Sequence, residues 1–296
     1  MEEVVSEVVS EVVSMKRCRS CAIAILQSAI FVVAVFPLAM IAIYSFELPR
    51  NMQGYIQAME DVRNAGTVPV RIYVQEFSLA QYYHVLIQHT EYIRLYANSI
   101  VYSVAITAVQ LLLGSLVAFS ISCFHLRFRN AVYMLYVVLM LMPFQVLIVP
   151  NYFMLRWMRL LNTPYALILS GVFGPLTVFL LRQYMVNLPF SLIEATAIDG
   201  GNYLSAYRYV VMPLCKPAIV AAVALLFADA WNMVEQPLVL LQDKTLYPLS
   251  LALVDAAFPL GDSQYAAIVL FTIPPLLLYL YHHEDLILGI QVGDMK

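Results

Sequence analysis

Charged residues are scarce in this chain of 296 residues, of which only 12% are Asp, Glu, Lys or Arg. A typical globular domain carries about a quarter, so this scarcity excludes an ordinary water-soluble domain. Hydrophobic residues make up 62% of the chain and the mean hydropathy is +0.80, which predicts a polytopic membrane protein. The net charge is −3, so no basic excess indicates nucleic acid as a partner.

The chain also lacks a nucleotide-binding loop. It contains no GxxxxGK[ST] motif, and no glycine in it is followed by lysine, so it has no loop of the kind that cradles ATP phosphates. No Ser/His/Asp or Cys/His set for catalysis is evident. We therefore expect no catalytic residue and no bound cofactor, and the energy for any transport must come from another chain or from an ion gradient.

Cysteine is sparse as well, and its four residues form no disulfide framework: Cys18, Cys21, Cys123 and Cys215. The first two make a lone CxxC pair without a second pair or a nearby histidine. The cluster His282–Asp285 lacks the i, i+4 histidine spacing of a helical metal site. We expect no metal at either place.

The chain begins with EVVS repeated three times over residues 3–14, a period that drifts around a helix, and we expect no stable fold there. Met15 is followed by Lys16, Arg17 and Arg19, so translation begins either at Met1 or, with the repeats as an upstream duplication, at Met15. By the positive-inside rule this basic flank places residues 1–20 in the cytosol as a tail.

Long apolar runs predict six transmembrane helices. We expect residues 21–296 to form one all-α transmembrane domain with a cytosolic C-terminus. The predicted spans are approximately 21–46, 96–124, 131–155, 164–185, 217–235 and 265–281.

The third span holds two prolines, Pro143 and Pro150, with Gln145 and Asn151 near them. Proline breaks inside a span are tolerated where they face protein or a water-lined cavity. The pattern indicates either a kinked packing helix or a polar lining of a translocation path, and both readings stay open.

Asp229 is the deepest charge in the chain, 13 residues past Lys216, or about 20 Å along a helix. A charge at this depth costs on the order of 3 kcal/mol, so it should face protein or water. Asn232 shares its helix face. Asp229 either lines a path together with Asn232, Gln145 and Asn151, or it reaches outward while Trp231 anchors the interface.

Residues 187–213 are the longest interruption between the apolar runs of the C-terminal half. Ser191 and Glu194 have the spacing of a capping box, which predicts that a short helix starts there. Gly200 and Gly201 are expected to end this helix in the left-handed conformation.

A second short helix is predicted over residues 203–212. Asn202 is placed to cap its N-terminus, and Pro213 is expected to stop it. A stiff helix–turn–helix tethered between two spans is typical of a docking element.

This stretch resembles the EAA loop of ABC-importer permeases, in which Glu-Ala-Ala is followed by Asp-Gly and later by Leu-Pro. Thr196 stands where the second Ala is usual, and Met212 stands where Leu is usual. The matching residues are Glu194, Ala195, Asp199, Gly200 and Pro213.

Other segments of residues 77–296 resemble carbohydrate-uptake permeases. Gln81 stands where Asn is usual. Met233 stands where an acid is usual, with Glu235 two residues later. The similar segments are 77–83, 98–99, 161–169, 179–185 and 231–232.

The resemblance implies a MetI-like fold of six spans with a cytosolic coupling helix, in the inner membrane of a bacterium. It implies that the chain is a permease subunit that pairs with a second permease, a dimer of ATP-binding subunits that bind ATP and magnesium, and an external solute-binding protein. The loop would insert into a cleft on the ATPase, with Glu194 and Asp199 fixing the fold of the loop and its register.

The implied solute is a sugar or a related molecule, and the alternative is glycerol-3-phosphate or another small polar solute. An ion-coupled secondary transporter would need inverted repeats and ionisable residues at the midplane, and the sequence has no convincing repeat. A membrane-embedded enzyme is a third class, for which no catalytic constellation is evident.

Overall fold

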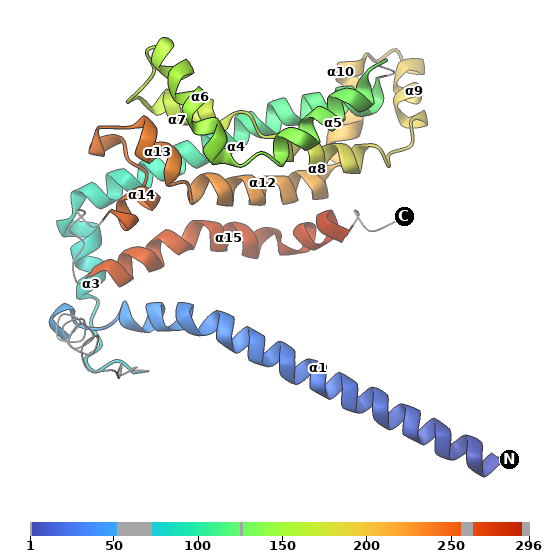
Figure 1. The fold of residues 1–296 in the computed structure, drawn as a ribbon, viewed down its shortest axis with the longest axis horizontal. Coiled ribbons are helices and arrows are strands. Elements are labelled where there is room, and N and C mark those ends of the chain that lie inside the picture. The colour runs from blue at the N-terminus through green and yellow to red at the C-terminus, as the bar shows by residue number, and fades with distance from the viewer. Residues whose placement is uncertain (1, 52–72, 125–126, 256–262, 292–296) are drawn as a thin grey trace. The chain divides into compact units, whose positions relative to one another are not determined.

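A computed structural model describes residues 2–51, 73–124, 127–255 and 263–291, with side chains described only between residues 23 and 286 (Figure 1). Helices are the regular elements in these ranges, apart from one isolated bridge between Glu47 and Phe77. The predicted all-α class is therefore confirmed.

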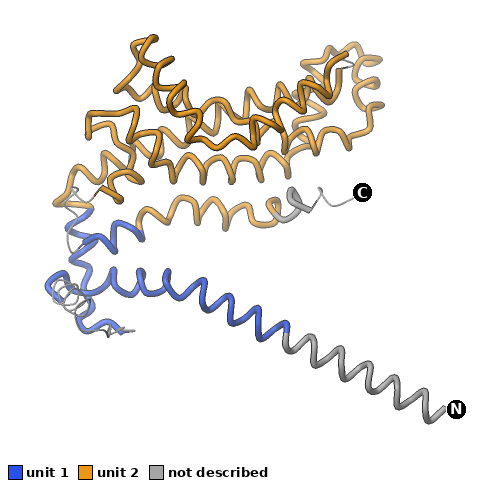
Figure 2. The backbone as a smooth tube through the Cα atoms, in the orientation of Figure 1, with its two compact units in different colours: residues 1–85, 260–269 blue, residues 86–259, 270–296 orange. Residues whose placement is uncertain are grey.

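The chain divides into two compact units (Figure 2). Unit 1 comprises residues 1–85 and 260–269, and unit 2 comprises residues 86–259 and 270–296.

In unit 1, helix α1 runs from Glu2 to Tyr44. The expectation that residues 3–14 have no stable fold is therefore wrong for the backbone. The segment contains neither proline nor glycine. Extending an existing helix also avoids the unfavourable step of nucleating a new one.

Gln81, in the short helix α3 (Ala80–Tyr83), is fully buried beside the end of α1. Its amide nitrogen donates to the carbonyl oxygens of Tyr44 at 2.7 Å and Glu47 at 2.9 Å. Its amide oxygen accepts from the backbone N–H of Ala266 at 3.3 Å. Gln81 thus satisfies carbonyl groups left free where α1 ends.

Glu47 is a buried carboxylate in unit 1, 4% exposed. Its oxygens accept from the Asn51 side chain at 2.9 Å and from the backbone N–H groups of Gln75 and Glu76 at 2.8 and 3.2 Å. Burial raises the pKa of Glu47, but these hydrogen bonds outweigh it and hold the pKa below the ordinary 4.5.

Unit 2 is built around α4, which packs against α8 and α12 (Figure 1). Helix α15 (Gln264–Gln291) begins in unit 1 and continues in unit 2. The other helices of unit 2 are α4 (Thr90–Cys123), α5 (Arg129–Met140), α6 (Phe144–Trp157), α7 (Pro164–Gly171), α8 (Pro175–Met185), α9 (Ser191–Ile198), α10 (Tyr203–Ser205), η2 (Ala206–Val211), α11 (Met212–Leu214), α12 (Lys216–Trp231), α13 (Glu235–Leu240), η3 (Lys244–Leu246) and α14 (Leu249–Val254).

The close approach of α4 and α8 depends on Gly114. A Cβ atom at this position would lie 2.7 Å from Cγ2 of Thr177, closer than side chains tolerate. Small residues of this kind let membrane helices approach closely, where lipid provides no hydrophobic force between helices.

Four helices in the described ranges are long and apolar enough to cross a membrane, and the number rises to six if each of two bent pairs forms one span. The single helices are Ile23–Tyr44, Thr90–Cys123, Pro164–Met185 and Gln264–Leu286. The bent pairs are α5 with α6, at 100°, and Tyr203–Leu214 with α12, at 79°.

The bend between α5 and α6 falls at Pro143, where the sequence predicts a break. Pro150 lies inside the continuous helix α6. A second interruption separates α7 from α8, and there the Gln110 side chain donates to the freed carbonyl of Gly171. Polar groups released inside a membrane helix need such internal partners.

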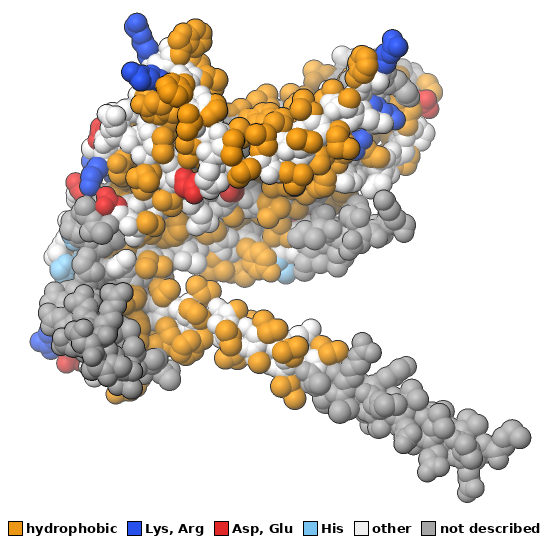
Figure 3. Space-filling view, viewed as in Figure 1, with side chains coloured by type: hydrophobic (Ala, Val, Ile, Leu, Met, Phe, Trp, Pro, Cys, Tyr) orange, Lys and Arg blue, Asp and Glu red, His pale blue; other side chains and the backbone are white. Residues whose placement is uncertain are grey.

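Helices α9 and α10 lie at one end of unit 2, and α7, α13 and α14 lie at the opposite end (Figure 1). On the face of unit 2 in view, basic side chains gather towards the two ends, while acidic ones also lie among hydrophobic side chains near the middle (Figure 3). The two candidate sites of unit 2 also differ in the sign of the charged side chains that line them.

Candidate functional site: a helical turn and two cavities

The turn after α9 has the geometry that its glycines predict. Gly200 has a φ of +81°, in the left-handed region. The N–H of Gly200 donates to the carbonyl of Ala197 at 3.1 Å, and the N–H of Gly201 donates to that of Thr196 at 2.9 Å. This pair of bonds is a Schellman motif, so the predicted left-handed helix end is confirmed at Gly200, whereas Gly201 does not have a positive φ.

The predicted capping box is wrong. The residue before the helix is Phe190, whose φ of −62° and ψ of −26° are already helical, and no side chain caps the helix. The turn starts at Pro189, whose carbonyl accepts from the N–H of Leu192 at 3.2 Å. Ser191 therefore lies inside the helix, where its hydroxyl cannot act as the cap.

The cap of the second helix is confirmed. The side-chain oxygen of Asn202 accepts from the N–H of Ser205 at 2.9 Å and from its hydroxyl at 3.0 Å. This bond satisfies one of the free N–H groups at the helix start.

The predicted stop at Pro213 is wrong, because the helical course continues through the π-helix η2 and through α11 to Leu214. Pro213 lies in the first turn of α11, where its missing N–H is not required. The direction changes instead at Cys215, ahead of α12.

Several residues of the turn are exposed, including Glu194, Ala195, Asp199, Gly200 and Pro213, while Thr196 is half-buried and bonds to the Leu192 carbonyl. Neither carboxylate makes a hydrogen bond or ion pair with another described residue. Among the described residues, no side-chain bond is therefore present by which Glu194 or Asp199 would fix the fold of the loop, and their role in its register on an ATPase stays a prediction. Large apolar side chains are exposed beside them, among them Ile198 at 85%, Tyr209 at 71% and Leu204 at 65%.

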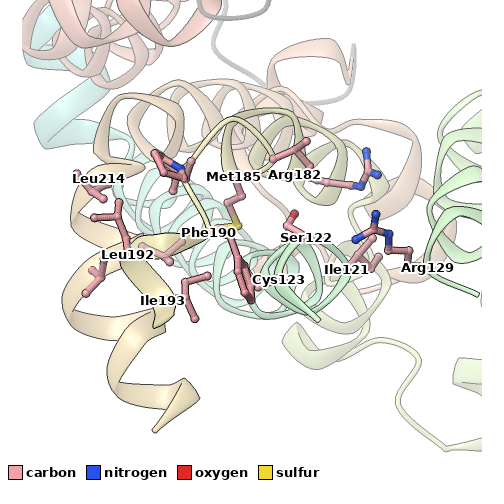
Figure 4. Close-up of a pocket in the computed structure, with 15 residues that line it drawn as sticks. Ile121, Ser122, Cys123, Arg129, Arg182, Met185, Phe190, Leu192, Ile193 and Leu214 are labelled. Atoms are coloured by element: carbon pink, nitrogen blue, oxygen red, sulfur yellow. The ribbon is translucent and has the colours of Figure 1, made fainter. Parts of the chain in front are cut away.

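A pocket of about 380 Å³ lies between this turn and the ends of α4 and α8 (Figure 4). We call it the loop pocket. Residues from α9, η2 and α11 line it together with Ser122, Arg129 and Arg182.

A second and larger cavity, of about 940 Å³, lies within unit 2, and we call it the wide cavity. It brings together three of the predicted path residues, Asn151, Asp229 and Asn232. The fourth, Gln145, donates from its amide nitrogen to both carboxylate oxygens of Glu235, at 3.0 Å each, and Glu235 lines the cavity.

Sequence reasoning missed four polar residues of the wide cavity as path candidates: Gln110, Ser170, Glu235 and Gln236. Gln110 stands alone in the apolar run of α4, and an isolated polar residue inside a span is a signal that could have found it. In the sequence, Glu235 stands out only as the acid two residues after Met233, the position where an acid is usual in similar permeases.

Asn98 and Ser99 do not line either cavity; they hold the segment after α13. The Asn98 amide donates to the carbonyls of Thr245 and Tyr247 at 2.9 and 3.0 Å. The Ser99 hydroxyl accepts from the N–H of Leu249 at 2.7 Å. These bonds attach an irregular segment to the start of α4.

The chain is similar to permeases of several bacterial transport systems. It is 27% identical to the arabinooligosaccharides transport system permease protein AraQ of Halalkalibacterium halodurans, over 89% of this chain and 92% of that protein. It is 27% identical to the lactose transport system permease protein LacG of Rhizobium radiobacter, over 67% and 74%. It is also 27% identical to the sn-glycerol-3-phosphate permease protein UgpE of Salmonella typhi, over 65% and 70%.

The fold is shared with a solved structure. A chain of a bacterial ABC transporter involved in import of the acidic polysaccharide alginate superposes with a TM-score of 0.75 at 20% identity, over 90% of this chain and 96% of that one. Residues 110–283, more than half of the chain, match the binding-protein-dependent transport system inner membrane component family. The turn and the described residues of both cavities lie almost wholly within this match, and the chain belongs to that family of membrane permeases.

Proposed function

We propose that this permease imports a neutral oligosaccharide and that its 187–213 loop receives the force of a separate ATP-binding subunit. The observation that carries the proposal is that the family match, residues 110–283, contains both the exposed turn and the polar cavity. One chain thus holds a candidate contact for an ATPase and a candidate path for the solute.

The turn is suited to docking because it is rigid and presents both charge and apolar surface. The Schellman bonds of Gly200 and Gly201 hold the turn, and Ile198 is 85% exposed beside the unpaired carboxylates of Glu194 and Asp199. Exposed apolar residues in contiguous groups mark interaction sites. Contact there would move the Tyr203–Leu214 segment and, through Cys215, helix α12.

The wide cavity favours a neutral solute. Its described lining carries two carboxylates, Asp229 and Glu235, and no Lys, Arg or His. Carboxylates accept hydrogen bonds from sugar hydroxyls, and amides both accept and donate them, whereas the negative charge of the carboxylates repels a phosphate. Relatives named for arabinooligosaccharides and lactose fit this chemistry better than the relative named for glycerol-3-phosphate.

The remaining parts of the proposal concern assembly and topology. A second permease chain, a dimer of ATP-binding subunits that hold ATP and magnesium, and an external solute-binding protein would complete the importer. The chain itself would catalyse no reaction. It would cross the bacterial inner membrane six times within residues 21–296, with the tail 1–20, the 187–213 loop and the C-terminus in the cytosol.

The test is uptake by proteoliposomes that contain the full chain, its partner permease, the ATPase and the binding protein. We expect accumulation of a labelled neutral arabinooligosaccharide or lactose when ATP is enclosed, unchanged by a proton uncoupler. Labelled glycerol-3-phosphate should not accumulate. Uphill uptake by the chain alone, driven by a proton gradient, would show a secondary transporter instead.

A further inference from the structure

Two guanidinium groups line the loop pocket, and no acidic residue is among its described lining residues. Arg129 begins α5, and Arg182 lies in the last turn of α8. Both side chains extend to the same side of the pocket, with Ser122 beside them (Figure 4). Like charges repel, so two such groups without a carboxylate favour the binding of an anion.

Two polar atoms at this pocket are buried and unpaired. Arg182 Nε and Ser122 Oγ are both inaccessible, and neither has a hydrogen-bond partner in the part of the chain that the structure describes. The Cζ atom of Arg182 lies 3.6 Å from the centre of the Tyr133 ring, a cation–π contact that holds the guanidinium in place. A bound oxygen anion would supply the acceptor that buried donors require.

The other side chains that line the pocket are apolar. Its other side is formed by residues of the turn, including Phe190, Leu192, Ile193 and Leu214 (Figure 4). The volume of about 380 Å³ lies within the range of about 300–1,000 Å³ that is typical of small-molecule pockets. The space is therefore suited to an anionic group attached to an apolar body.

The position of the pocket indicates where such a molecule comes from. Ser122 lies one residue before the end of α4, and Arg182 lies near the end of α8. Both helices belong to candidate membrane spans, so their ends lie at the level of the lipid headgroups. Basic pockets between helix ends are suited to anionic headgroups.

We propose that the loop pocket binds the phosphate group of an anionic phospholipid through Arg129, Arg182 and Ser122. The apolar side of the pocket would hold the adjoining part of the lipid. A lipid bound there touches both the ends of α4 and α8 and the turn that follows α8. Its presence would therefore stabilise one position of the 187–213 loop. This proposal does not depend on the identity of the transported solute.

The test uses the full chain in nanodiscs of phosphatidylcholine with a graded fraction of phosphatidylglycerol, and native mass spectrometry measures how much phosphatidylglycerol the chain retains. We expect wild type to retain it selectively. Arg129→Gln and Arg182→Gln should each weaken retention about tenfold, the equivalent of about 1.4 kcal/mol. Arg182→Lys, which keeps the charge, should weaken it less.

The matched control is Arg156→Gln, which removes an arginine near the end of α6 that does not line the pocket. It should retain phosphatidylglycerol as wild type does. Arg129 is exposed, so Arg129→Gln should fold even if Arg182→Gln does not. Equal retention by wild type and Arg129→Gln would overturn the proposal.

A second arm separates lipid from free phosphate. Inorganic phosphate is titrated onto wild type and Arg129→Gln in pure phosphatidylcholine nanodiscs, and the melting temperature is measured. Phosphate that stabilises only wild type, without selective retention of phosphatidylglycerol, would support the phosphate site and overturn the lipid as its source. If neither phosphatidylglycerol nor inorganic phosphate has an effect, both the phosphate site and the lipid as its source are overturned.

Discussion

The loop pocket and the wide cavity belong to the same compact unit, yet they carry opposite charges. Among the described lining residues, the loop pocket has Arg129 and Arg182 and no acid, while the wide cavity has Asp229 and Glu235 and no base. Few charges are available in this chain, and each site receives only one sign. This division of charge agrees with the two proposals, in which the first site binds anionic oxygens and the second binds neutral hydroxyl groups.

The largest effect on transport is expected from a substitution in the turn that lines the loop pocket. Gly200→Val places a β-branched residue at a φ of +81°, where an ordinary L-residue already costs about 1–2 kcal/mol. We expect ATP-driven uptake in proteoliposomes to fall to background while the chain still inserts into the membrane.

Gly200→Asn is the matched control for this change, because asparagine tolerates the left-handed region better than valine does. It should retain a measurable part of the uptake. Normal uptake by Gly200→Val would count against the docking role of the turn.

The sign of the charge at residue 229 in the wide cavity can be reversed by one substitution. Asp229→Lys places a base where the described lining has only acids. We expect the KM for a neutral oligosaccharide to rise about tenfold or more, since loss of a charged hydrogen-bonding group costs about 1.5–3 kcal/mol. Initial rates of uptake at graded solute concentrations measure this change.

Asp229→Asn keeps the shape and the hydrogen-bonding capacity, so it should change KM less than Asp229→Lys does. Unchanged kinetics in Asp229→Lys would show that this residue faces away from the path.

A larger side chain that forces α4 and α8 apart should disturb the loop pocket and the wide cavity together. Gly114 lies on α4 between Gln110, which lines the wide cavity, and Ile121, which lines the loop pocket. Gly114→Ala would meet Thr177, and such overpacking costs about 1–3 kcal/mol. We expect a lower melting temperature in detergent and a moderate loss of uptake.

Thr177→Ala removes the methyl group that a Cβ at position 114 would meet first. The double variant should therefore regain part of the lost stability. If Gly114→Ala alone has the melting temperature of wild type, residues 114 and 177 are not in close contact.

The smallest effect is expected at Glu47, a carboxylate in unit 1 that is fully hydrogen-bonded, unlike those of the turn. Its pKa is lowered on folding, so the stability that it contributes is present above the unfolded value of about 4.5 and is lost as the pH falls through the lower, folded value. We expect wild type to lose thermal stability in that acid range and Glu47→Gln to show a flatter pH dependence.

At neutral pH Glu47→Gln should melt somewhat lower than wild type and keep the wild-type KM. A large change in KM would instead place Glu47 in the transport path, and would remove the distinction between structural and path carboxylates.

Local features of the site could be predicted from the sequence because they depend on neighbouring residues. Gly200 and Asn202 act within their own turns, and Pro143 acts on its own helix. Asp229 and Asn232 share a helix face by their spacing alone. Each of these expectations is met by the structure or, for the path role, stays a proposal.

Other features depend on residues that are distant in sequence. Gln145 reaches Glu235 across 90 positions, through the bend between α5 and α6 and the turn after α12. The unpaired atoms of Ser122 and Arg182 become neighbours of one pocket only when α4 packs on α8. The predicted capping box was wrong for a local reason, because a turn already starts at Pro189 and the residue before α9, Phe190, is already helical.

The bend at Cys215 has a consequence for movement in the membrane. Asp229 lies about 20 Å along α12 from that bend, so a swing of the helix axis by about 10° displaces it by about 3.5 Å. This distance exceeds the length of a hydrogen bond. A change in angle that leaves every turn of α12 intact is therefore enough to exchange one set of partners in the wide cavity for another.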